Sequence, residues 1–363
     1  MGIQSRRFAI SKQLLAALLG LALIPVCPAE EYFDKYGLTP ASAPLDLGIQ
    51  PLGYPSGVIS AVMQHDRILK KALIATGHPL QAHAFRRGAD MVALLADQRL
   101  EAGLLGDIPT LLAAASGKVW IVGLVKQTST AIVAKGDTQV RGLAGKRIAY
   151  VETSSAHHTL LQGLSSVGLK ESDVKFVAMG VDAMPDALER GEIDAFAAWE
   201  PSPSIALSNS DKNRIVFRGL SSDYFVIERD FAKQAPQATD ALIAGYLRAI
   251  EWMRRSQKNI EKAARWAMAD TQTFSGKAAT LPVAHIVAIT RREILNVPSA
   301  PAILSNPSAP PLLKTEFDFL KGKNKIPAGT PWENIEAALG FDRLTRIMAD
   351  TRKFQIGTFD YED

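Results

Sequence analysis

The sequence has a single cysteine, Cys27, among its 363 residues. This cysteine lies in an N-terminal segment that we expect to be removed on export. The remaining chain would then contain no thiol, which excludes disulfides, thiolate metal sites and a cysteine nucleophile.

Long hydrophobic runs are also scarce. The longest at the N-terminus spans residues 14–24, which matches a secretion signal and is too short to cross a bilayer. Three basic residues precede it: Arg6, Arg7 and Lys12. Small residues at Cys27 and Ala29 predict a signal peptide over residues 1–29, cleavage after Ala29 and a periplasmic protein. A twin-arginine route and lipid anchoring at Cys27 remain as less favoured alternatives.

The expected mature chain lacks a charge excess. The formal net charge of +4 includes three basic residues from segment 1–29, and the rest carries 38 basic against 37 acidic side chains. This balance indicates neither nucleic acid nor an anionic membrane as the main partner. The chain also lacks a Walker phosphate loop, a Ser-His-Asp signature and histidines at metal-ligand spacing. We therefore predict no catalytic residue, no metal and no cofactor.

Strand and helix patterns alternate through most of the chain, which is typical of an α/β fold with a parallel or mixed sheet. We expect two lobes with crossovers near residues 130–135 and 217–224. The expected segments are residues 45–130 with 218–300 for lobe 1, residues 131–217 for lobe 2, and residues 301–363 for a Pro/Ser-rich linker and tail. A last helical piece is predicted near residues 332–349. One helix is predicted over residues 57–73.

In open α/β sheets, ligands bind beyond the carboxyl ends of the strands, where helices begin. Helix starts offer free N–H groups and a positive dipole end, so they bind anions. Loops at such positions give these candidates: Gln50, Tyr54, Arg86, Gly106, Asp107, Thr128, Ser154, Ser155, His157, Trp199 and Glu200. Each has a plainer interpretation. Ser154 and Ser155 could only cap their helix, and Arg86 with Arg87 could be a solvated pair.

The stretch "ETSSAHHTLL" (residues 152–161) contains adjacent histidines. At 100° per residue, His157 lies on the apolar stripe of the predicted helix, while His158 points toward solvent. Neighbours in sequence do not face each other on a helix, so the pair cannot chelate one metal. His157 is either a packed core histidine or a residue facing the cleft, and the positive helix end favours its neutral form.

Residues 142–202, "GLAGKRIAYVETSSAHHTLLQGLSSVGLKESDVKFVAMGVDAMPDALERGEIDAFAAWEPS", resemble a known family. They look like the second lobe of the periplasmic solute-binding proteins of nitrate/sulfonate/taurine ABC importers, a group that includes binders of thiamine pyrimidine precursors. "GDIPTLLAAASGK" (residues 106–118) resembles a helix start in the first lobe. The resemblance covers roughly residues 45–268, and the tail lies outside it.

This resemblance implies a two-lobed periplasmic-binding-protein (type II) fold. Each lobe would be a mixed sheet flanked by helices, hinged by two crossovers, with a helical C-terminal extension. The protein would be a monomer that binds a small anionic solute and delivers it to permease and ATPase subunits. The family's cleft contacts fall on Gly106, Asp107, Ser154, Ser155, His157, Trp199 and Glu200. Either Gly48-Ile49-Gln50 or Gly53-Tyr54-Pro55 would occupy the first-strand position.

Two alternatives accompany this interpretation. The ligand could be an aromatic heterocycle stacked on Trp199, or the chain could be an enzyme similar to the aromatic sulfinate desulfinases. The desulfinase route needs a cysteine, which only Cys27 could supply. The leading hypothesis also makes a geometric prediction: the helix starts at Gly106-Asp107 and Ser154-Ser155 should face each other across the cleft.

Overall fold

The computed structural model describes residues 36–40, 43–295 and 312–362. The predicted signal peptide, with Cys27, and most of the Pro/Ser-rich stretch therefore lie outside the described residues. From residue 39 onward the chain forms one unit. None of the described helices is both long and apolar enough to cross a membrane.

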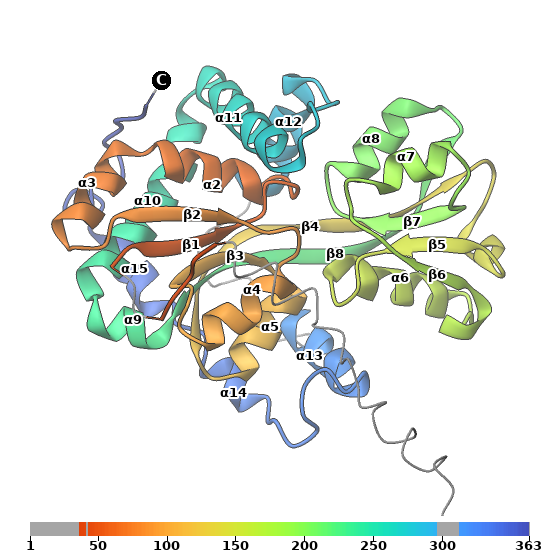
Figure 1. Cartoon of the computed structure of the whole chain (residues 1–363), viewed down its shortest axis with the longest axis horizontal. Coiled ribbons are helices and arrows are strands. Elements are labelled where there is room, and N and C mark those ends of the chain that lie inside the picture. Colours follow the sequence, from red (N-terminus) through yellow and green to blue (C-terminus); the bar gives the residue numbers. More distant parts are fainter. Residues whose placement is uncertain (1–35, 41–42, 296–311, 363) are drawn as a thin grey trace, which may run out of the picture. The chain divides into compact units, whose positions relative to one another are not determined.

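One mixed sheet of eight strands forms the centre of this unit (Figure 1). In spatial order its strands are β2 (Leu80–Ala84), β1 (Leu45–Ile49), β3 (Ala102–Gly106), β8 (Asn213–Glu228), β4 (Val119–Lys135), β7 (Ala195–Ala198), β5 (Arg147–Tyr150) and β6 (Lys175–Ala178). β1 runs parallel to β2 and β3, and β5 runs parallel to β6 and β7. The antiparallel strands β4 and β8 join these two parallel groups.

β4 and β8 are much longer than the sequence pattern suggested. They pair along their whole length, from Val119 opposite Glu228 to Lys135 opposite Asn213. We expected separate strands at residues 119–125 and 130–134, and a sheet in each lobe. Instead, both crossovers remain hydrogen-bonded to each other, so the two groups of strands share one sheet. A register shift between Leu124 and Lys126 interrupts the ladder, and such bulges redirect side chains.

Helices cover both faces of the sheet (Figure 1). Beside β1 to β3, one face carries α2 (Ser56–His65), α10 (Pro236–Arg255), α11 (Gln257–Ser275) and α12 (Val283–Thr290), and the other carries α4 (Ala89–Ala96) and α5 (Asp107–Ala115). Beside β5 to β7, α7 (Met184–Glu189) and α8 (Ser202–Asn209) lie on one face and α6 (Ser155–Ser166) on the other. A large hydrophobic core lies around β1 to β3 and the helices α2, α10 and α11, and it includes Tyr246 and Phe225.

The single helix predicted over residues 57–73 is two helices, α2 and α3 (Arg67–Ala75). The break is at Asp66, which has an extended backbone. Its carboxylate Oδ1 accepts the N–H groups of Ile68 (2.9 Å) and Leu69 (3.1 Å). These hydrogen bonds make Asp66 the N-cap of a new helix, which a continuous helical pattern of apolar residues does not reveal.

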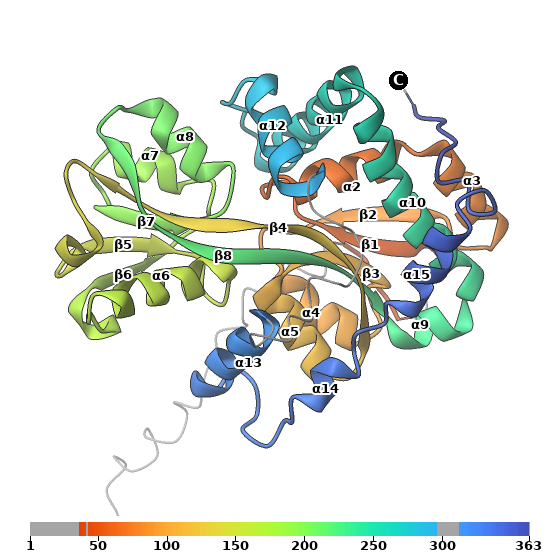
Figure 2. The same cartoon turned by 180° about the vertical axis from the view of Figure 1, so that it is seen from behind.

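The C-terminal residues wrap around the first group of strands (Figure 2). α9 (Arg229–Gln234) leads into α10, and α15 (Asp342–Ala349) packs on α10. α13 (Leu312–Gly322) and α14 (Glu333–Glu336) both contact α5. The helix predicted near residues 332–349 is thus two short helices, and α13 precedes them inside the stretch expected to be a linker.

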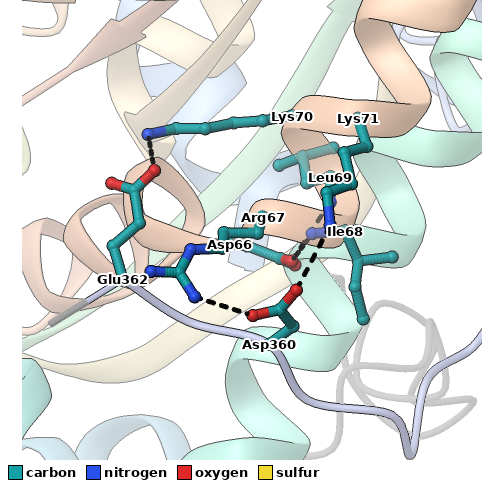
Figure 3. A network of polar contacts seen from close by, with 8 residues as sticks. All are labelled: Asp66, Arg67, Ile68, Leu69, Lys70, Lys71, Asp360 and Glu362. Atoms are coloured by element: carbon teal, nitrogen blue, oxygen red, sulfur yellow. Dashed lines mark hydrogen bonds and ion pairs between the residues drawn. The ribbon is translucent and has the colours of Figure 1, made fainter.

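The last described residues are bound to the start of α3 (Figure 3). Three surface ion pairs connect them: Arg67 with Asp360 (3.2 Å), Lys70 with Glu362 (2.8 Å) and Lys71 with Asp360 (3.5 Å). A buried ion pair lies at the same place, with Asp66 Oδ2 at 2.9 Å from Arg248 Nη1. Arg248 also donates from Nε to the carbonyl oxygen of Gln355 (3.1 Å). The buried pair therefore links α3, α10 and the C-terminal segment.

Candidate functional site

A cavity lies where the carboxyl ends of β1, β3, β5 and β7 approach the middle of β4 and β8. It encloses about 550 Å³ of empty space, part of it open to solvent. This is the position at which open α/β sheets bind ligands. The side chains and turns around it are Gln50, Gly53, Ser56, Arg87, Gly88, Ala89, Gly106, Pro109, Lys126, Thr130, Val151, Glu152, Thr153, Ser154, Ser155, Trp199, Ser221 and Asp223.

The starts of α5 and α6 meet at this cavity, as the sequence analysis predicted. Gly106 ends β3, Ser155 begins α6, and the Ser155 hydroxyl donates a hydrogen bond to the carboxylate of Asp107. A Cβ atom on Gly106 would lie 3.1 Å from Ser155 Oγ, so a side chain here would press on the facing turn. The glycine therefore permits the close approach of the two helix starts.

Ser154 caps α6 on the cavity side. Its hydroxyl oxygen accepts the N–H of His157 (3.2 Å), and its O–H donates to the carbonyl of Val151 (2.7 Å). Thr153 before it adopts a left-handed conformation with a φ of 56°, which is unusual for a β-branched residue. This sharp turn connects β5 to α6. The first N–H groups of a helix have no acceptor within it, so this turn provides donors for an anion.

An ion pair between a buried lysine and a partly buried aspartate forms one side of the cavity. Lys126 on β4 lies directly opposite Asp223 on β8, and its ammonium nitrogen is 3.6 Å from Asp223 Oδ1. Ser56, the first residue of α2, donates a hydrogen bond from its hydroxyl group to the same carboxylate. Burial raises the pKa of Asp223, while the charge of Lys126 and the Ser56 hydrogen bond oppose that increase. Arg87 adds a second, half-exposed cation, and it also pairs with Asp90.

Five predicted residues line this cavity: Gln50, Gly106, Ser154, Ser155 and Trp199. Gln50 is held by its side-chain amide, which donates to the carbonyl of Leu104 (3.0 Å). Gly53 also lines the cavity and Tyr54 does not, so both first-strand alternatives place one residue there. Asp107 lies behind the lining, fully buried, and accepts the hydroxyl of Ser155, which lines the cavity.

The remaining candidates lie elsewhere. Tyr54 is buried, its hydroxyl is 2.7 Å from Thr271 Oγ1, and burial raises its pKa to about 12. Arg86 points to Asp182 instead, at 3.2 Å. Glu200 is buried and accepts the N–H of Ser204 (3.3 Å). Thr128, on β4, pairs with Ser221 across the ladder and is not among the residues that line the cavity.

The two histidines have different outcomes. His157 packs against Tyr150 (ring centroids 4.7 Å apart, tilted) and edge-on against Phe176 (6.2 Å) and is not among the residues that line the cavity, which corresponds to the packed alternative. Burial lowers the pKa of His157 to about 4. His158 was expected in solvent and is instead buried, because α13 covers it and places Phe319 against its ring (4.5 Å). The helical wheel considers one helix alone and cannot include such a cover.

Of the pair Arg86-Arg87 considered from the sequence, Arg87 lines the cavity. Several other lining residues were not chosen from the sequence: Ser56, Lys126, Thr130, Ser221 and Asp223. Lys126 and Thr130 belong to a segment that was expected to be a loop, from which Thr128 was selected. Both lie in the long central part of β4 that pairs with β8. Asp223 carries no motif, and only its position opposite Lys126 identifies it.

Comparison with known proteins agrees with the resemblance described in the sequence analysis. Residues 113–268 match the model of the NMT1-like family. The taurine-binding periplasmic protein of Escherichia coli (strain K12) is 26% identical over 271 residues, which cover 70% of this chain and 80% of that protein.

Solved structures share the fold. The alkanesulfonate-binding protein SsuA from Xanthomonas axonopodis pv. citri, bound to MOPS, superposes with a TM-score of 0.63 at 23% identity and covers 83% of this chain and 99% of its own. The periplasmic aliphatic sulphonate binding protein SsuA from Escherichia coli gives 0.62 at 21%, covering 82% and 98%. The resemblance inferred from residues 142–202 is confirmed: the chain is a homologue of the periplasmic taurine- and sulfonate-binding proteins, and residues 113–268 connect it to the NMT1-like family.

Proposed function

We propose that the protein is the solute-binding component of an ABC importer, exported to the periplasm, and that it binds a small sulfonate in the cavity described above. It delivers this solute to the permease and its ATPase subunits and acts as a monomer without catalysing a reaction. The names of the homologues support this function. The groups of strands at residues 45–130 with 218–300, and at residues 131–217, serve as the two lobes that close on the solute.

One observation carries the choice of an anion. The start of α6 and two cationic side chains, Lys126 and Arg87, surround the same cavity. A sulfonate presents three acceptor oxygens and one negative charge, which suit backbone N–H donors together with Lys and Arg. The Ser154 and Ser155 turn provides the donors, and Lys126 provides a charge that is shielded from water.

Two acidic residues line the cavity, Glu152 and Asp223. Glu152 is exposed and pairs with Lys325 (3.2 Å), so Asp223 is the one that narrows the solute class. Asp223 lies beside Lys126 and also lines the cavity, so a ligand with an ammonium group finds a carboxylate there. Taurine carries both a sulfonate and an ammonium group. A charge-assisted hydrogen bond contributes about 1.5–3 kcal/mol, or roughly 10- to 100-fold in affinity. We therefore expect taurine to bind more tightly than ethanesulfonate, which lacks the ammonium group.

Isothermal titration calorimetry on the purified protein tests this function. Taurine, ethanesulfonate, nitrate and a hydroxymethylpyrimidine are compared, first with the wild type and then with Asp223→Asn. The expected order places taurine first, and the substitution should remove its advantage over ethanesulfonate while leaving ethanesulfonate binding within a few-fold. Tight binding of the pyrimidine with none of either sulfonate would refute the proposal and favour stacking on Trp199.

A further inference from the structure

A carboxyl group from the C-terminal extension lies directly behind the cavity. Glu316 is on α13, is fully buried, and neither of its side-chain oxygens has a hydrogen-bond donor among the described residues. It is in side-chain contact with Asp107. α13 packs on α5, the helix that Asp107 begins (Figure 2).

Asp107 connects this carboxyl group to the cavity. One of its oxygens, Oδ1, accepts the Ser155 hydroxyl and the N–H of Ile108 (2.8 Å). The other, Oδ2, accepts the N–H of Ser222 (2.9 Å) on β8. Three elements therefore converge on one carboxylate, and Ser155 is the member of this set that lines the cavity.

Two buried carboxyl groups in contact cannot both be ionised at low cost, so one holds a proton. Burial, and then the charge of Asp107, raise the pKa of Glu316 well above its ordinary value. Asp107 already accepts three hydrogen bonds, so a donor is the partner that its carboxyl group can still take. The proton therefore belongs on Glu316, whose O–H donates to Asp107.

Asp223 also faces Asp107. Burial, together with the charge of Asp107, raises the pKa of Asp223, which has its own partner in Lys126. Two other titratable groups near Glu316, His158 and Tyr224, are uncharged. Burial lowers the pKa of His158, whose Nδ1 is 4.0 Å from Glu316 Oε1, so its ring is neutral. Burial also raises the pKa of the Tyr224 hydroxyl well above its ordinary value, and that group is neutral too.

We propose that Glu316 is a positioning residue of the solute-binding site, acting through Asp107 on the hydroxyl group of Ser155. This inference rests on the proposed function. The C-terminal extension is then part of the site, because Glu316 supplies a hydrogen-bond donor to Asp107. This hydrogen bond fixes the carboxyl group of Asp107, and the fixed carboxyl group orients the hydroxyl of Ser155. The same extension touches α6, since Phe319 packs on His158, so it holds the two helix starts at one spacing.

Titration of taurine by calorimetry distinguishes positioning from mere packing. Glu316→Gln retains a donor for Asp107, and we expect affinity within about three-fold of the wild type. Glu316→Met fills a similar volume without a donor, leaving Asp107 short of one partner, and should weaken taurine binding roughly ten-fold. Phe317→Leu is the matched control, because this buried residue on α13 faces Trp332 instead (ring centroids 5.5 Å apart). It should lower the melting temperature and leave affinity unchanged.

The positioning role is refuted if Glu316→Met binds taurine as the wild type does, or if Phe317→Leu weakens binding equally. A second readout needs no solute. The infrared carbonyl band of a protonated carboxyl group should be present in the wild type, absent in Glu316→Gln and shifted in Ser155→Ala. A band that Ser155→Ala leaves in place would overturn the coupling. If the wild type binds no sulfonate, but its carbonyl band is still lost in Glu316→Gln and shifted in Ser155→Ala, the proposed function is refuted and the coupling stands.

Discussion

Lys126→Met removes the buried cation of the proposed site and keeps most of the side-chain volume. Lys126 is 3% exposed and lies on the strand that both groups of the sheet share, so its charge is poorly screened by water. We expect this substitution to reduce the affinity for ethanesulfonate by roughly 100-fold, or about 2.7 kcal/mol. Ethanesulfonate is the suitable probe because it has no ammonium group to interact with Asp223.

The magnitude follows from two opposing effects. At a separation of about 4 Å and an effective dielectric constant of about 20, one pair of unit charges contributes about 4 kcal/mol. Removing Lys126 also removes the charge that holds down the pKa of Asp223, so that pKa rises further. A protonated Asp223 no longer repels the sulfonate, which returns part of the lost affinity. Binding by the variant should therefore improve as the pH falls, more than binding by the wild type does.

Calorimetry with a same-charge control checks this reasoning. Lys135 is on the same strand, 40% exposed, and pairs with Glu189 (3.6 Å) away from the cavity. Lys135→Met makes the same change in net charge and should alter the affinity less than about two-fold, because surface pairs contribute little. The double variant Lys126→Met/Asp223→Asn should recover part of the loss. Equal effects of Lys126→Met and Lys135→Met would show that only net charge matters, and the site assignment would fail.

Three further predictions concern stability and specificity. Arg248→Met leaves Asp66 buried without its partner and should lower the free energy of unfolding, measured in urea, by about 3–5 kcal/mol. Asp360→Ala removes a partner of the exposed pairs and should cost under about 1 kcal/mol. Similar losses for the two variants would contradict the distinction between the buried pair and the exposed pairs. The pKa of His157 is about 4 in the folded chain and 6.5 in the unfolded chain, so the unfolded chain binds more protons between these values. The free energy of unfolding should therefore fall by on the order of 2–3 kcal/mol from pH 7 to 4, and His157→Phe should reduce this slope. Trp199→Ala should weaken taurine binding only a few-fold in calorimetry, and a complete loss would favour a stacked heterocycle.

The sequence could predict the site where chain order and space coincide. A strand that ends at Gly106 or near Val151, followed at once by a helix, places a turn at the carboxyl edge of the sheet. The N-cap at Ser154 follows from the same local rule. These inferences need no knowledge of which strands are neighbours, because within each parallel group the strands end on the same side, toward the middle of β4 and β8.

The histidines show where a local rule fails. The helical wheel correctly separated His157 from His158, but it assigned solvent to any position off the apolar stripe. The exposure of His158 depends on α13, which follows more than a hundred residues later, and the Pro/Ser-rich stretch gave no sign that a buried helix comes after it. Long-range covering of this kind is tertiary information.

The ion pair at the cavity was inaccessible to sequence reasoning for a different reason. Lys126 and Asp223 meet because β4 and β8 pair in one register, and a slip of one residue would turn either side chain to the opposite face. That register depends on the bulge beside Lys126 and on continuous pairing through both crossovers. The crossovers were predicted as hinges that only connect two lobes. In the structure the same two strands also place Lys126 and Asp223 at the cavity. The segments that would move on closure are therefore also segments that would contact the solute. A solute that touches both Lys126 and the start of α6 would therefore interact differently with open and closed forms, which is the condition for ligand binding to shift that equilibrium.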